Sequence, residues 1–421
     1  MEVKYRTSII FALLLACVGS ALPLARAQTP GALAAPITSS KPGLDDLRAA
    51  AEKGDAESQF NLGLMYYKGE GAPQDYQEAA KWYTKSAEQG FAKGEFGLGW
   101  MYEEGLGGPQ DYKKALEWLS KAADQNDSGA EFALGFIYHD AQGVPQDYKL
   151  AMKWFTRAAE HGDSDAQFDL GLMYAQGEGT PVDFRQGVKW YTQAAEQDNP
   201  SAQYNLGLIY AAGQEGVPQN YQEAVKWLTK ASELGSSAAQ NYLGALYESG
   251  QGVPQDFPEA MKWYSKAAQK GDAQAQYNLG SMYLQGLGVP KDPKEAAKWY
   301  ARAADQDVPA AQYNLGILYE EGAGVPQDDK EAVKWYTKAA EAGDADAQNN
   351  LADMYENGQG VPKDLIRAYM WYTVAASTNE DLRKEIDQSL AEVSAQLNAQ
   401  QIAQAQEKAQ RCQQSHYKNC D

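Results

Sequence analysis

Three residues near the C-terminus have side chains and a spacing that suit chemistry. Cys412, His416 and Cys420 are four residues apart, so an unbroken helix would place them along one side as three ligands for a metal ion. The alternative is a disulfide between Cys412 and Cys420, the only two cysteines left if the chain is cleaved after Ala27. An even pair in an oxidising compartment favours the disulfide, with "SHYKN" as the turn between the cysteines. We therefore predict a disulfide and no metal site.

Other candidate catalytic residues are sparse. His139 and His161 fall in separate turns with no acid–nucleophile spacing around them, and we expect both to be exposed at helix ends. The stretch from Ser415 to Lys418 has the S-x-x-K form of penicillin-binding enzymes, but the sequence contains neither K-T-G nor S-D-N. The recurring G-x-G precedes proline and belongs to turns. The sequence thus predicts no catalytic residues and no cofactor.

A tryptophan recurs through most of the chain at a nearly constant interval. Every step is 36 residues except one of 37, and the tryptophans concerned are Trp82, Trp118, Trp154, Trp190, Trp227, Trp263, Trp299, Trp335 and Trp371. The extra residue lies in "AAGQEGVPQN", which marks that segment as a loop because loops tolerate changes in length. A fixed period of this size predicts a repeat array.

Each unit is predicted to contain two helices. If Asp55 is position 1, small and apolar residues at positions 4, 8, 11 and 12 share one face of a first helix. Glycine at position 9, from Gly63 to Gly316, costs about 1 kcal/mol each and indicates close approach of a neighbouring helix. Gly and Pro then end the first helix, and Asp75 with Glu78 predicts a capping box for the second. Stacking such units would make one continuous core.

The units have the pattern A-x-x-x-L-G-x-x-Y, then G-x-G-V-P-x-D, then A-x-x-W-x-x-x-A-A. This pattern resembles the Sel-1-like repeat, a relative of the tetratricopeptide repeat. The resemblance implies an all-α solenoid with a right-handed superhelix, serving as a scaffold for protein contacts. It also implies that bacterial members are often exported. A cysteine-rich branch linked to β-lactams carries a cysteine pair in each repeat, which these units lack.

We predict five segments in the chain. They are a signal peptide (1–27), a flexible leader (28–43), an N-terminal capping helix (44–54), nine repeats (55–379), and C-terminal capping helices with the cysteine-containing tail (380–421). The signal is indicated by Lys4 and Arg6, an apolar run, and small residues ending at Ala27. Alternatively, "LLAC" ending at Cys17 loosely matches a lipoprotein signal. No later segment is apolar and long enough to span a bilayer.

The charge of the chain restricts its partners. With 37 Lys and Arg against 57 Asp and Glu, the net charge is −20, so the chain should repel nucleic acid. A protein or peptide with a basic patch is the better partner. An acidic rim that would attract it comprises Glu103, Glu104, Asp140, Glu320 and Glu321.

Two rows of the first helices are candidate partner-binding residues. Position 10 is apolar in the first five units, at Leu64, Trp100, Phe136, Leu172 and Leu208. Position 7 is often asparagine, at Asn61, Asn205, Asn278, Asn314 and Asn350. One hypothesis packs position 10 between adjacent first helices. The other makes it an exposed groove for a peptide or helix, with the asparagines holding the partner's backbone.

The sequence as a whole predicts a non-enzymatic scaffold or adaptor in the bacterial periplasm, one that regulates an envelope or signalling protein. The alternative function is a β-lactamase-like or peptidoglycan-acting envelope protein.

Overall fold

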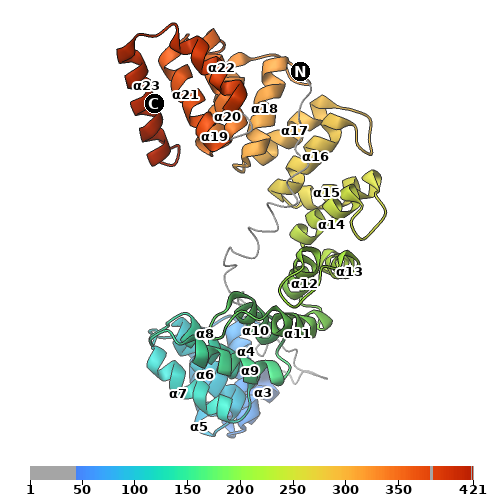
Figure 1. Cartoon of the computed structure of the whole chain (residues 1–421). Helices are drawn as coiled ribbons and strands as arrows, with labels where there is room; N and C mark the ends of the chain where they lie inside the picture. The colour runs from blue at the N-terminus through green and yellow to red at the C-terminus, as the bar shows by residue number, and fades with distance from the viewer. Residues whose placement is uncertain (1–43, 380–382, 419, 421) are drawn as a thin grey trace. The chain divides into compact units, whose positions relative to one another are not determined.

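The computed structural model describes residues 44–379, 383–418 and 420 (Figure 1). Within these residues the chain forms 21 helices, and the only β-type pairing is an isolated bridge between Gln214 and Val217. None of the described helices is long and apolar enough to cross a membrane. The predicted signal peptide, the lipoprotein alternative and the leader lie outside the described residues.

The chain divides into two units, residues 1–234 and 235–421. The first unit contains α3 (Leu44–Glu52), α4 (Ala56–Lys68), α5 (Tyr76–Glu88), α6 (Ala92–Glu104), α7 (Tyr112–Asp124), α8 (Ser128–His139), α9 (Tyr148–Glu160), α10 (Ser164–Gln176), α11 (Phe184–Glu196), α12 (Pro200–Ala212) and α13 (Tyr221–Glu233). After α3, its helices follow in pairs as repeats 1 to 5.

The second unit contains α14 (Ser237–Ser249), α15 (Phe257–Gln269), α16 (Ala273–Gln285), α17 (Pro293–Ala304), α18 (Pro309–Glu321), α19 (Asp329–Glu341), α20 (Ala345–Asn357), α21 (Leu365–Thr378), α22 (Arg383–Ser394) and α23 (Ala399–Gln414). The helices from α14 to α21 form repeats 6 to 9, and α22 and α23 follow them. The predicted all-α solenoid of two-helix repeats is confirmed.

Helix ends follow the residue types at the boundaries, with one correction. The N–H of Glu78 donates to the Asp75 carboxylate at 3.0 Å, so Asp75 caps α5 as expected. The Glu78 carboxylate, however, lies 2.6 Å from Lys81 Nζ. A nearby cation one turn ahead competes for the glutamate, and the reciprocal half of the capping box is not formed. Both halves are present at α23, between Asn398 and Gln401.

The glycine at position 9 marks the close approach that its recurrence predicted. A Cβ atom at Gly63 would lie 2.7 Å from the ring of Tyr83, and one at Gly135 would lie 2.5 Å from the ring of Phe155. These fully buried rings come from the second helix of the same repeat. In repeats 1 to 8, a large side chain of the second helix thus packs directly against the glycine backbone of the first.

Candidate functional site

The apolar row at position 10 is part of the core. Leu64, Trp100, Phe136, Leu172 and Leu208 are 4–7% exposed. Leu64 and Trp100 belong to one hydrophobic cluster, and the indole N–H of Trp100 donates to the hydroxyl of Tyr67 on the preceding first helix at 3.3 Å. Phe136 packs edge-on against Phe155, with ring centroids 5.4 Å apart.

These contacts correct the groove hypothesis. The exposure that it required is absent, because consecutive first helices approach closely enough to cover the position-10 side chains. The packing hypothesis, which the sequence also allowed, accounts for this row.

The asparagines of position 7 lie at the margin of the core and contact the fold itself. Asn205 and Asn314 are buried, whereas Asn61, Asn278 and Asn350 are partly exposed. The Asn278 amide donates to the side chain of Asn241 at 3.0 Å. Asn278 therefore connects repeat 7 to repeat 6, and only part of the row is accessible to a partner.

At the same position, repeat 4 has a carboxylate. Asp169 is fully buried, and neither of its oxygens has a hydrogen-bond partner among the described residues. Burial raises the pKa of Asp169 well above its ordinary value, and the nearby carboxylates of Asp165, Asp163 and Asp140 raise that pKa further.

The main polar structure, which the sequence interpretation missed, is a row of side chains at position 5. Every one is 0–5% exposed, and the row comprises Gln59, Glu95, Glu131, Gln167, Gln203, Gln240, Gln276, Gln312 and Gln348. The recurrence of one amide at one position was the signal that could have found it. A buried amide needs partners on both sides, so the repeated glutamine predicts a repeated hydrogen-bond arrangement.

Six of these glutamines donate to a backbone carbonyl eight residues earlier, at the end of the preceding second helix. The acceptors are Ala51, Ala159, Ala195, Ala268, Ala304 and Ala340. The side-chain oxygen can then accept from a residue 30 positions later. Gln348 shows the whole arrangement: it donates to the Ala340 carbonyl at 3.1 Å and accepts from the Thr378 hydroxyl at 3.3 Å. Each such side chain ties three helices together.

Glu131 replaces the glutamine in repeat 3, and a cation compensates for it. Arg157 Nη2 donates to the Ala123 carbonyl at 2.8 Å and lies 2.9 Å from Glu131 Oε1. Ala123 is the residue eight positions before Glu131. The guanidinium therefore makes the hydrogen bond to this carbonyl that a glutamine amide makes in other repeats. His161 Nδ1 lies 2.7 Å from the other carboxylate oxygen.

Of the two histidines of this region, His161 is exposed at a helix end as expected, and His139 is not. The His161 side chain is 38% exposed at the C-terminal cap of α9 and pairs with Glu131. The His139 side chain is 13% exposed, because its ring packs against Tyr148 and its Nε2 lies 3.0 Å from Glu178. His139 thus corrects the expectation of an exposed side chain. No set of three or more His, Cys, Asp and Glu in the described residues could hold a metal ion.

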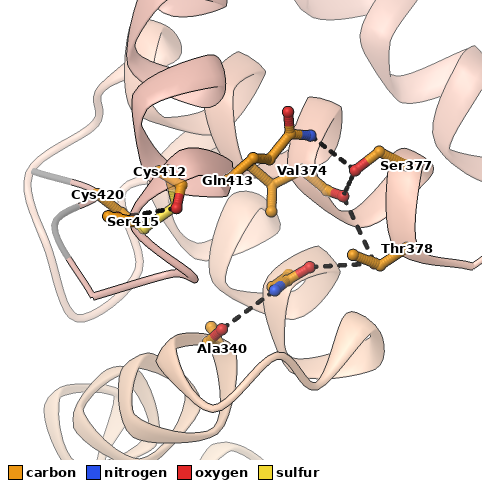
Figure 2. The surroundings of a disulfide bond; sticks show 9 residues. Ala340, Val374, Ser377, Thr378, Cys412, Gln413, Ser415 and Cys420 are labelled. Atoms are coloured by element: carbon orange, nitrogen blue, oxygen red, sulfur yellow. Dashed lines mark hydrogen bonds between the residues drawn. A yellow bond between two sulfur atoms is a disulfide. The ribbon is translucent and has the colours of Figure 1, made fainter.

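The hypothesis that Cys412, His416 and Cys420 bind a metal ion required one continuous helix, and the helix ends before His416. Helix α23 ends at Gln414, and His416 and Tyr417 have left-handed backbone, with φ of 52° and 65°. The chain therefore turns back and brings Cys420 against Cys412, with Cα atoms 4.3 Å apart (Figure 2).

Helix α23 and the turn that follows it are hydrogen-bonded to the last repeat and within the turn itself. The Gln413 amide donates to the Ser377 hydroxyl at 2.7 Å, which links α23 to the end of α21 (Figure 2). The Ser415 hydroxyl donates to the Cys412 carbonyl at 2.9 Å, so its proton is engaged within the turn.

Known proteins share this arrangement of repeats. The family model described as Sel1 repeat matches residues 56–91, 92–127, 128–163, 164–199, 200–236, 237–272, 273–308, 309–344 and 345–377. The chain is 35% identical to the crystal structure of a protective antigen of uropathogenic Escherichia coli strains that displays an SLR fold. That match has a TM-score of 0.78 and covers 90% of this chain and 80% of the antigen.

Two further relatives agree with this match. A Sel1 repeat protein from Oxalobacter formigenes is 34% identical, with a TM-score of 0.61, over 85% of this chain and 98% of that one. A sel1-like repeat-containing protein of Acanthamoeba polyphaga mimivirus is 45% identical over 42 residues, which are 10% of this chain and only 7% of that protein. From the nine consecutive matches and the solved structures, we conclude that the chain belongs to the Sel1 repeat family.

Proposed function

We propose that this protein is a scaffold that binds a basic protein or peptide in the bacterial periplasm and thereby regulates an envelope or signalling protein. Sel1 repeat proteins in general act as scaffolds for protein interaction, and this chain consists mainly of such repeats. The net charge of −20 supports a basic partner, because opposite charge speeds association and excludes other acidic proteins. Export rests on the sequence of residues 1–27 and is in line with the similarity to a protein described as a protective antigen.

The observation that carries the proposal is the polar character of the accessible first-helix surface. The apolar row is buried, while Asn61, Asn278 and Asn350 stay partly exposed and Glu321 is exposed at the end of α18. We therefore place partner recognition on the second unit, at the amides of Asn278 and Asn350 and the carboxylate of Glu321. Such contacts weaken as salt is added, whereas an apolar groove would be little affected.

The experiment is a crosslinked pull-down from periplasmic extract with three baits: the wild type, Glu321→Lys and Asp305→Lys. Asp305 is the matched control, an exposed acid that caps the second helix α17. We expect a partner that binds the wild type and Asp305→Lys but not Glu321→Lys, and whose purified form binds less tightly at high salt. Equal capture by all three baits would contradict recognition by this surface.

A pull-down that recovers no specific protein would count against the scaffold itself. The alternative, a β-lactamase-like or peptidoglycan-acting protein, then requires activity from the purified chain. Turnover of a cephalosporin and sedimentation with purified peptidoglycan are the two direct tests, and we expect neither to be positive.

A further inference from the structure

Repeat 2 carries an incomplete version of the position-5 arrangement. Glu95 is 4% exposed, and its Oε2 accepts from the Gln125 amide at 2.7 Å. Repeat 4 has the same bond, since the Gln197 amide donates to Gln167 Oε1 at 2.8 Å. Gln167 also donates to a carbonyl eight residues earlier, but an ionised glutamate has no proton to donate.

The cation that compensates in repeat 3 has no equivalent in repeat 2. The residue that corresponds to Arg157 is Lys121, whose Nζ lies 3.1 Å from Glu117 and 3.8 Å from the centre of the Trp118 ring. Lysine is a single point charge on a flexible chain and lacks the planar set of donors with which arginine bonds two groups at once. The residue eight positions before Glu95 is Ala87. Its backbone carbonyl therefore accepts a hydrogen bond from neither a glutamine amide nor a guanidinium.

We propose that Glu95 makes the junction between repeats 1 and 2 sensitive to protons. When the carboxyl group takes up a proton from solvent, its O–H donates to the Ala87 carbonyl, as the glutamine amide does in six other repeats. The neutral carboxyl group has nearly the shape of the amide and keeps its bond from Gln125. Acid thus tightens this junction, and neutral pH loosens it.

The electrostatic surroundings of Glu95 favour its neutral, protonated form. Burial raises the pKa of Glu95, and Asp124 on α7 raises it further, whereas the hydrogen bond from Gln125 and the charge of Lys121 lower it. A carboxyl group whose pKa is higher in the folded chain than in the unfolded chain binds more protons when folded. Stability must therefore increase as pH falls from neutral towards the ordinary pKa of a glutamate.

The experiment measures amide hydrogen exchange of α5, α6 and α7 in the full-length protein, corrected for the intrinsic pH dependence of exchange. In the wild type we expect exchange to be about fivefold slower near pH 5 than at neutral pH, which is the effect of one hydrogen bond. Glu95→Gln should show the slow exchange at both pH values. If Glu95→Gln exchanges as the wild type does at neutral pH, the proposal is overturned.

Two matched variants separate this effect from other titrating groups. Gln167→Glu places the same carboxyl group in repeat 4, where Gln193 stands at the arginine position. Acid dependence around α9 and α10 should therefore exceed that which Asp163 and Asp169 give to the wild type. Glu131→Gln removes the partner of Arg157 and His161 and should speed exchange around α8 and α9 at both pH values. A folded Gln167→Glu variant with no more acid dependence around α9 and α10 than the wild type would also contradict the proposal.

Discussion

The first unit of the chain buries carboxylates as well as amides, whereas the second unit buries amides. Among the described residues, the buried carboxylates of the first unit are Glu95, Glu103, Glu131 and Asp169, whereas the buried polar side chains of the second unit are Gln240, Asn241, Gln276, Gln312, Asn314 and Gln348. The repeats are otherwise alike in length and packing. An amide can donate to the backbone carbonyl that the repeat geometry places beside it, as Gln203 and Gln312 do. A carboxylate instead depends on a donor or a proton from its surroundings. The comparison shows that the same repeat can bury an amide or a carboxylate. Only the carboxylate makes the stability of the repeat depend on pH.

The largest effect is expected from Trp100→Asp, which would put a charge in the core of the first unit. The second unit has an aspartate at the same position, Asp353, and there the hydroxyl of Tyr372 donates to it. Trp100 has apolar neighbours, so we expect a loss of about 3 kcal/mol or more in the free energy of unfolding. Thermal unfolding followed by circular dichroism measures it. Trp100→Phe is the control, and an unchanged melting temperature of Trp100→Asp would show that the side chain is accessible.

A second prediction concerns the proposed Cys412–Cys420 disulfide. Replacing both cysteines by serine should lower the stability of the second unit by about 2–3 kcal/mol, because the bridge restricts the unfolded chain. Amide exchange should rise in α21 and α23 and stay unchanged in the first unit. A reducing agent should destabilise the wild type but not the double variant. Free thiols in the mature protein, detected by mass, would contradict the bridge.

Asp169→Asn should stabilise the first unit by about 1–2 kcal/mol at neutral pH, because it replaces a buried carboxylate by the amide found at this position in repeats 1, 5, 7, 8 and 9. The raised pKa of Asp169 means that the wild type gains stability as pH falls. The advantage of the variant should therefore shrink in acid. Chemical unfolding at several pH values tests this, and a variant less stable than the wild type at neutral pH would reveal a donor for Asp169.

The smallest effect is expected at Asp163, the N-cap of α10, where burial raises the pKa to about 6. Because this pKa is raised, the wild type should lose stability as pH rises through about 6. Asp163→Asn keeps a side chain that can cap, as Asn199 does for α12, and should remove that dependence. The difference at neutral pH should be below about 1 kcal/mol, which thermal unfolding at matched pH values can detect.

Local features of the sequence determined the repeat and its helices. The 36-residue interval, the glycine at position 9 and the caps act within one unit, where neighbours in sequence are also neighbours in space. Gly63 illustrates this, since the ring that requires it belongs to the same repeat.

Only the tertiary structure decided which polar and apolar faces are accessible. Periodicity placed Trp100 and its counterparts on one face of a helix, but the approach of the next repeat determined that this face is buried. Glu95 and Glu131 are the same residue type at the same position, yet Arg157 completes one site and Lys121 does not complete the other. The partners of these side chains lie between eight and thirty residues away in the sequence. Their positions are set by how the helices pack, which a local pattern does not encode.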